Sequence, residues 1–161
     1  MQIRPLPAGM LIAILTIFFD QLSKWWVLNL VMVPPKTIEV TQFFNLVLVH
    51  NRGASFGIFS DAPGWASIAL IVFAIIISIV LAIWMWQAQE AFLSIALALV
   101  IGGAIGNVID RIRFGAVVDF LDVHAGGWHW PAFNVADSAI TLGVILLILD
   151  SLKSKSEKPK Y

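Results

Sequence analysis

The chain has 161 residues, of which 60% are hydrophobic and 12% are charged, and its formal net charge at pH 7 is zero. A soluble domain of this length cannot bury so much apolar surface, so the composition indicates an integral membrane protein with a single domain. The absence of a basic patch argues against a nucleic-acid partner, and the absence of cysteine excludes disulfides, thiol nucleophiles and cysteine-ligated metals. The three histidines form no helical His-x-x-x-His pair, so we expect no metal and no other cofactor.

Hydrophobic segments of about the length that a bilayer requires predict membrane-spanning helices at about 9–32, 65–86, 91–110 and 134–150. The first segment starts like the core of a signal peptide, but no small-residue cleavage site follows it. Asp20 and Lys24 interrupt this segment instead, and hydrophobicity resumes at Trp25, so we expect a retained first span.

Residues 37–50, between the first two spans, are rich in β-branched and aromatic residues, which predicts strands outside the membrane or on its surface. Turn signals follow at residues 51–54 and 60–64. We expect residues 36–60 to form a small extracytoplasmic, β-rich platform over the functional site, although a plain connecting loop is the alternative. The predicted fold class is therefore membrane all-α with a small β element, ending in a disordered basic tail at 153–161.

The distribution of basic residues predicts the orientation of the chain. Four spans put both termini on one side, which carries Arg4 and the four lysines of the tail, whereas the opposite loops carry Lys36, Arg52, Arg111 and Arg113. The tail lysines are closely spaced, so the positive-inside rule places both termini in the cytoplasm. The polar junction before the fourth span then opens to the extracytoplasmic face.

Polar residues concentrate at the junction of the third and fourth hydrophobic segments. They comprise four aspartates and two asparagines, Asp110, Asp119, Asp122, Asp137, Asn107 and Asn134. Ionisable groups at membrane depth are costly and are functional candidates by default. Two carboxylates that share a site cannot easily both ionise, so one of them holds a proton near neutral pH. Such a pair can drive attack by water on an amide, and we predict an intramembrane aspartic endopeptidase with Asp119 and Asp137 as the catalytic pair.

The other polar residues of this junction have simpler interpretations. Asn134 is expected to be the N-cap of the last helix, with Asp137 in its first turn. Asp110 adjoins Arg111, which favours a structural ion pair over catalysis for this aspartate. Asp122 is expected to face solvent and to stay outside the catalytic pair.

Residues 111–133 are too apolar for a free loop, so we expect them to leave the membrane only partly. The Gly- and Trp-rich stretch 126–131 suits the membrane interface or a flexible lid. His124 and His129 are interpreted as loop or interface residues rather than as general bases. Gly102 and Gly106 form a small-residue pair that favours close helix packing.

Asp20 and Lys24 lie four residues apart and therefore share one face of the first span. They can form a neutralising ion pair that lets the helix sit in lipid, or they can face the bundle interior and support the functional site. The two interpretations are compatible.

Two other classes of function compete with the peptidase. A small proton- or cation-coupled transporter or channel subunit would also use intramembrane aspartates, but it would place them along the axis of the bundle. A scaffold without chemistry would use them only for capping and pairing. Carboxylates gathered at one end of the bundle favour the peptidase.

Five sequence blocks resemble the lipoprotein signal peptidase (signal peptidase II) family, and together they cover nearly the whole chain. The blocks are DQLSK at 20–24, NRGASF at 51–56, GGAIGNVIDR at 102–111, VVDF at 117–120 and PAFNVAD at 131–137. The one small departure is Ser55, where the family more often has alanine.

The resemblance implies that Asp119 and Asp137 are the catalytic pair and that no metal is needed. It further implies site-supporting or substrate-contacting roles for Asn107, Asp110, Arg111, Asn134, Asn51, Gly53, Asp20 and Lys24. The implied substrate is a prolipoprotein that carries a diacylglyceryl group on the cysteine that follows the cleavage site. The resemblance also implies inhibition by the cyclic peptide globomycin and a location in the bacterial inner membrane, and we expect contact with membrane lipid and a monomer.

Overall fold

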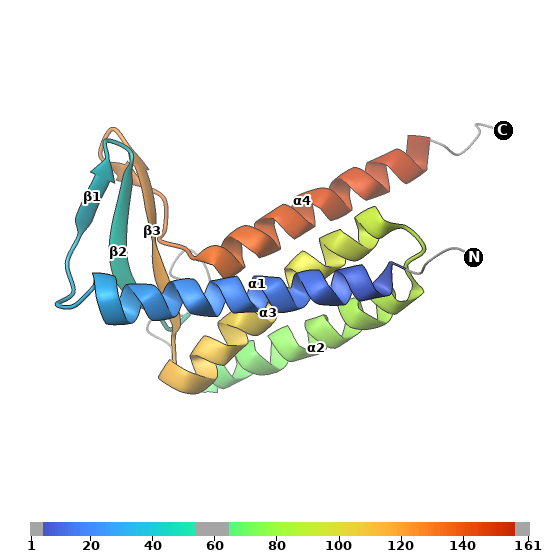
Figure 1. The fold of residues 1–161 in the computed structure, drawn as a ribbon, viewed down its shortest axis with the longest axis horizontal. Helices are drawn as coiled ribbons and strands as arrows, with labels where there is room; N and C mark the ends of the chain where they lie inside the picture. The colour runs from blue at the N-terminus through green and yellow to red at the C-terminus, as the bar shows by residue number, and fades with distance from the viewer. Residues whose placement is uncertain (1–4, 54–64, 157–161) are drawn as a thin grey trace.

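The computed structural model describes residues 5–53 and 65–156, and these form four long helices and a four-stranded antiparallel sheet (Figure 1). The helices are α1 (Leu6–Trp26), α2 (Trp65–Gln87), α3 (Ala91–Phe114) and α4 (Val135–Ser156). The strands are β1 (Ile38–Thr41), β2 (Phe44–Asn51), β3 (Val117–Ala125) and β4 (Trp128–His129). The predicted fold class, a membrane all-α protein with a small β element, is confirmed.

The helix boundaries differ from the predicted ones mainly at the C-terminal ends. A π-helical turn, Val27–Val31, extends α1, so the first span reaches close to its predicted end. α3 continues past residue 110 to Phe114, where Gly115 takes the left-handed conformation (φ 70°) that commonly ends a helix. α4 runs to Ser156, so residues 153–156 are helical rather than part of a disordered tail. The turn predicted at 60–64 lies outside the described residues.

All four helices are long and apolar enough to cross a membrane. In α2 the buried residues are Ala66, Ser78 and Met85, and most of its large apolar side chains lie on the outer surface. Such a surface would be costly in water, but it suits lipid, whose chains are as apolar as the side chains. The composition and the helices therefore agree that the chain is a multi-pass membrane protein.

α3 is the central helix and contacts each of the other three helices. Two glycines make its closest contacts possible. A Cβ atom at Gly103 would collide with the backbone oxygen of Ala136 on α4, and one at Gly106 would lie 2.6 Å from Oδ2 of Asp20 on α1. The predicted role of the small-residue face in helix packing is confirmed, and it brings a buried carboxylate of α1 against α3.

The sheet lies at one end of the helices, with strand order β1-β2-β3-β4 (Figure 1). The first turn of α1 and the last turn of α4 both lie at the opposite end. The strands predicted within residues 37–50 are confirmed, but the sheet also includes β3 and β4, for which no strands were predicted. In the central pair, Val49 of β2 faces Asp119 of β3, and Asn51 faces Val117. The sheet thus carries Asp119 to the end of the helix bundle.

Candidate active site

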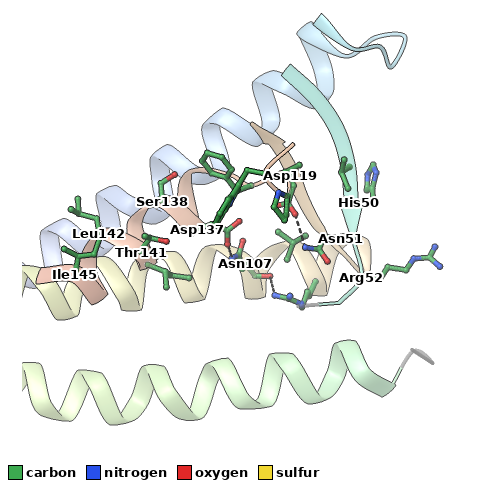
Figure 2. A pocket seen from close by; sticks show the side chains of 18 residues that line it. His50, Asn51, Arg52, Asn107, Asp119, Asp137, Ser138, Thr141, Leu142 and Ile145 are labelled. Carbon is green, nitrogen blue, oxygen red and sulfur yellow. Dashed lines mark hydrogen bonds between the residues drawn. The ribbon is translucent and has the colours of Figure 1, made fainter. Parts of the chain in front are cut away.

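A cavity of about 960 Å³ opens where the sheet meets α3 and α4 (Figure 2). Two of the described residues that line it are acids, Asp119 from β3 and Asp137 from the first turn of α4. The remaining wall comes from β2, α3, the segment before α4, and one face of α4. The predicted catalytic pair therefore faces a single cavity, although its members come from different elements.

Two asparagines link the two aspartates through hydrogen bonds. The amide nitrogen of Asn134 donates to Asp119 Oδ1 at 2.7 Å and lies 3.3 Å from Asn107 Oδ1. The amide nitrogen of Asn107 donates in turn to Asp137 Oδ1 at 2.8 Å. These bonds hold both carboxyl groups in defined orientations on the same cavity wall, as Figure 2 shows for Asp119, Asp137 and Asn107.

Asp119 is almost fully buried, with 2% of its surface exposed. Burial, and next the negative charge of Asp137, raise the pKa of Asp119 to about 7, even though Asn51 and Asn134 donate hydrogen bonds to it. Asn51 makes its bond at 3.0 Å to the second carboxyl oxygen. Near neutral pH this aspartate can therefore hold a proton, as a general acid requires.

The raised pKa of Asp119 predicts that stability depends on pH. In the folded protein the group keeps its proton up to a pH of about 7, whereas in the unfolded chain it loses that proton near the ordinary aspartate pKa of 3.8. The stability that protonation contributes is thus complete below about pH 4 and is lost as the pH rises through about 7. We expect the Tm in detergent to fall over this window, and to fall less in Asp119→Asn, as measured by differential scanning fluorimetry. Parallel curves for the two proteins would contradict this assignment.

Asp137 lies at the N-terminal end of α4, where a carboxylate is favoured by the unpaired backbone N–H groups. Its backbone N–H donates to Oδ1 of Asn134 at 2.9 Å, and the backbone N–H of Asn134 donates to Oδ2 of Asp137 at 3.3 Å. This reciprocal pair is a capping box, so the predicted N-cap role of Asn134 is confirmed. Capping and exposure to the cavity are therefore combined in one side chain.

Behind the cavity wall lies a buried cluster of charges. Nζ of Lys24 lies 2.8 Å from Oδ2 of Asp20 and 2.7 Å from Oδ2 of Asp110, and it donates to Oδ1 of Asn107 at 3.2 Å. Asp20 and Asp110 are 0% exposed and Lys24 is 2% exposed. The Asp20–Lys24 pair thus faces the bundle interior and contacts the site, as one of the two sequence interpretations proposed.

The predicted pairing of Asp110 with Arg111 is wrong. Neighbouring residues on a helix point to different faces, so Asp110 turns inward to Lys24 while Arg111 turns toward the cavity. Asp110 also accepts a hydrogen bond from the backbone N–H of Val118 at 3.1 Å. This bond fixes the start of strand β3 next to Asp119, so Asp110 supports the site without lining it.

Asp20 reaches across the bundle to α4. Its Oδ1 accepts the backbone N–H of Ala136 at 2.9 Å, which satisfies one of the unpaired donors at the start of that helix. The Asp20 carboxylate therefore binds both Lys24 and the backbone of Ala136, the residue just before Asp137 on α4.

Arg111 and Asn51 both line the cavity, and Gly53 links them through hydrogen bonds. A terminal nitrogen of Arg111 donates to the backbone oxygen of Gly53 at 2.9 Å. The backbone N–H of Gly53 donates to Oδ1 of Asn51 at 3.1 Å, while the amide of Asn51 holds Asp119. These contacts bring together three residues that the sequence predicted only separately as site residues.

Sequence reasoning missed or misplaced two further residues. Gln21 donates to Oδ1 of Asp110 at 2.9 Å and accepts from Arg113 at 3.2 Å, yet nothing in the sequence around Gln21 indicates these contacts.

Asp122 was expected to face solvent, but it is buried, with 6% exposed, because Asn45 of β2 and His129 of β4 cover and bind it. The missed strand β3 had a usable signal, since residues 117–125 contain three valines and a phenylalanine and lie between Gly115 and Gly126.

One face of α4 continues the cavity away from Asp119. It presents Asp137 and Ser138 at the polar end, followed by Thr141, Leu142 and Ile145 on successive turns (Figure 2). The groove thus changes from polar to apolar along its length, which suits a ligand that has a polar reacting group and an apolar extension.

The comparisons with known proteins agree on one family. A family model described as signal peptidase (SPase) II matches residues 12–153. The lipoprotein signal peptidases of Burkholderia vietnamiensis and Burkholderia ambifaria are 50% and 48% identical over 143 residues, which cover 88% of this chain and 86% of each relative.

Solved structures are similar as well. One, described as a bacterial membrane enzyme, is 35% identical and superposes with a TM-score of 0.84 over 96% of this chain and 93% of its own. A second structure with a similar description is 36% identical, with a TM-score of 0.78 over 91% of this chain and 94% of its own. The similarity therefore extends over helices and sheet together.

Proposed function

Because the chain belongs to the signal peptidase II family, we propose that Asp119 and Asp137 are the catalytic pair with which it removes signal peptides from prolipoproteins. The observation that carries this proposal is that the two acids among the described lining residues face one cavity and are joined by two asparagines. The transporter alternative is not supported, because Asp20, Asp110, Asp119 and Asp137 belong to one hydrogen-bonded cluster beside β3 and are not spread along the bundle axis.

The environments of the two acids suggest their roles. Asp119 has its pKa raised to about 7 and serves as the protonated acid. Asp137 lies at a helix N-terminus and accepts two N–H donors, one from the side chain of Asn107 and one from the backbone of Asn134, so it serves as the ionised base. Asn107 is a strong donor here because its carbonyl oxygen accepts from the Lys24 ammonium.

Hydrolysis then proceeds without a covalent intermediate. Asp137 takes a proton from water while the water oxygen attacks the scissile carbonyl carbon, and Asp119 gives its proton to the carbonyl oxygen. In the resulting gem-diol, Asp137 returns the proton to the leaving nitrogen as the C–N bond breaks. Asp119 recovers a proton from a diol hydroxyl, which restores both acids to their starting states.

The substrate is a prolipoprotein whose cysteine after the cleavage site carries a diacylglyceryl group. The amphiphilic groove along α4 supports this, because it pairs a polar catalytic end with an apolar extension toward the helix bundle. A lipidated substrate would enter sideways from the bilayer, and globomycin would block the same cavity. We place the enzyme as a monomer in the inner membrane, with both termini cytoplasmic and the site at the extracytoplasmic face.

Cleavage of one prolipoprotein in three forms tests this proposal in detergent or lipid without added metal. The forms are diacylglyceryl-modified, unmodified, and capped on the same cysteine by a small alkyl group. We expect cleavage of the lipidated form only, with the other two at least about a hundredfold slower, because the apolar binding energy is missing. Equal cleavage of all three would contradict lipid recognition, and cleavage of none by a folded protein would contradict the peptidase.

A further inference from the structure

The buried Asp122 takes no part in the hydrolysis described above, yet both of its carboxyl oxygens have hydrogen-bond partners. Both of its carboxyl oxygens lie 2.9 Å from Nδ1 of His129, and the amide of Asn45 donates to Oδ2 at 2.9 Å. Although burial raises it, the hydrogen bonds from His129 and Asn45 and the nearby histidines hold the pKa of Asp122 below its usual value. The carboxylate is therefore ionised and available to bind His129 at neutral pH.

The Asp122–His129 pair joins two strands that share little backbone pairing. β4 has two residues, and its register with β3 consists of His124 facing His129 and Ala125 facing Trp128. The two histidine rings stack with their centres 4.7 Å apart. A hairpin this short is marginal on its own, so the hydrogen bond between the buried Asp122 carboxylate and the half-exposed His129 ring is a side-chain anchor for it.

The chain that leaves β4 forms a wall of the cavity. Residues 130–133 follow His129 directly, and all four line the cavity. The backbone N–H of Trp130 donates to Val123 at 2.8 Å, and that of Phe133 donates to Leu121 at 3.0 Å. Between these two bonds lie Pro131, which has no N–H, and Ala132. The wall is therefore bonded to β3 at both ends, and its outer end follows directly on His129.

We propose that Asp122 and His129 are positioning residues that fix the 130–133 wall and thereby set the affinity for the prolipoprotein segment that lies in the cavity. This inference rests on the proposed function. The Asn134, Asn107 and Asn51 bonds to the catalytic pair do not pass through the hairpin, and Phe133 has its own bonds to β3. Loosening the hairpin should hence weaken binding and leave the chemical step intact.

A matched pair of substitutions tests this role. His129→Leu removes the donor to Asp122, whereas His129→Asn can keep a donor near the position of Nδ1. We expect His129→Leu to raise KM for the lipidated prolipoprotein about tenfold, with kcat within about twofold of wild type. His129→Asn should recover most of this loss, and Glu39→Gln, at an exposed acid of β1, should leave KM unchanged.

Hydrogen exchange of the same proteins in detergent provides a second measurement. Residues 126–133 should exchange faster in His129→Leu than in wild type or His129→Asn, while residues 134–145 remain unchanged. If His129→Leu does not fold, Asp122→Asn replaces it, because it removes the charge and keeps an acceptor oxygen. An unchanged KM, equal KM values in the Leu and Asn variants, a fall confined to kcat, or unaltered exchange would overturn the inference. Absence of wild-type cleavage would instead refute the proposed function.

Discussion

Asp119→Asn or Asp137→Asn is expected to lower the rate of prolipoprotein cleavage by at least about a thousandfold, the range that one general acid or base supplies. An asparagine in place of Asp137 cannot take a proton from water, and one in place of Asp119 cannot give a proton to the carbonyl oxygen. Both replacements keep the shape of the side chain and an acceptor oxygen for the bonds from Asn134 and Asn107. The loss should appear in the rate constant of the chemical step, measured by single-turnover cleavage of the lipidated substrate.

The matched control for this experiment is Asp150→Asn. Asp150 is on α4 as well, but it lines a different, smaller cavity at the far end of that helix, so cleavage should be unchanged. The variants must also give the same helical circular dichroism as wild type, which separates lost chemistry from lost folding. Substantial turnover by Asp119→Asn or by Asp137→Asn would show that the catalytic pair is wrongly assigned.

Lys24→Met is expected to lower the free energy of unfolding by about 3–5 kcal/mol, the typical cost of removing one partner from a buried ion pair. The substitution leaves the carboxylates of Asp20 and Asp110 without their cation, and both are 0% exposed. Methionine fills a similar volume, so the loss measures charge rather than packing. The measurement is the Tm in detergent, together with the folded yield from membranes.

Charge compensation provides the sharper test of this cluster. Lys24→Met leaves the carboxylates of Asp20 and Asp110 without a cation. Adding Asp110→Asn removes one of these two unpaired charges, so the double variant should recover part of the stability that Lys24→Met loses. Lys153→Met, at an exposed lysine near the end of α4, should leave the Tm unchanged. Additive losses in the double variant would mean that Lys24 and Asp110 act independently, contrary to the 2.7 Å contact between them.

The two acids of the proposed catalytic pair could be picked out from sequence because a carboxylate inside an apolar stretch is costly and conspicuous. The contacts of Asp110 and Asp122 could not. Lys24 reaches Asp110 because α1 packs closely against the glycine face of α3, and Asp122 is covered because β2 and β4 lie on both sides of β3. Gln21 was overlooked for the same reason, since its partners are on α3.

The features that could be predicted correctly from sequence are those that depend on short stretches of chain. The four spans follow from the length of each apolar run against the thickness of a bilayer, and the Asn134–Asp137 cap follows from contacts within one helical turn. That Lys24 meets Asp110, and that Asp119 and Asp137 share one cavity, follows from how the helices and the sheet pack together. Those contacts join residues far apart in the chain, and their partners are selected by how closely the helices and strands can pack.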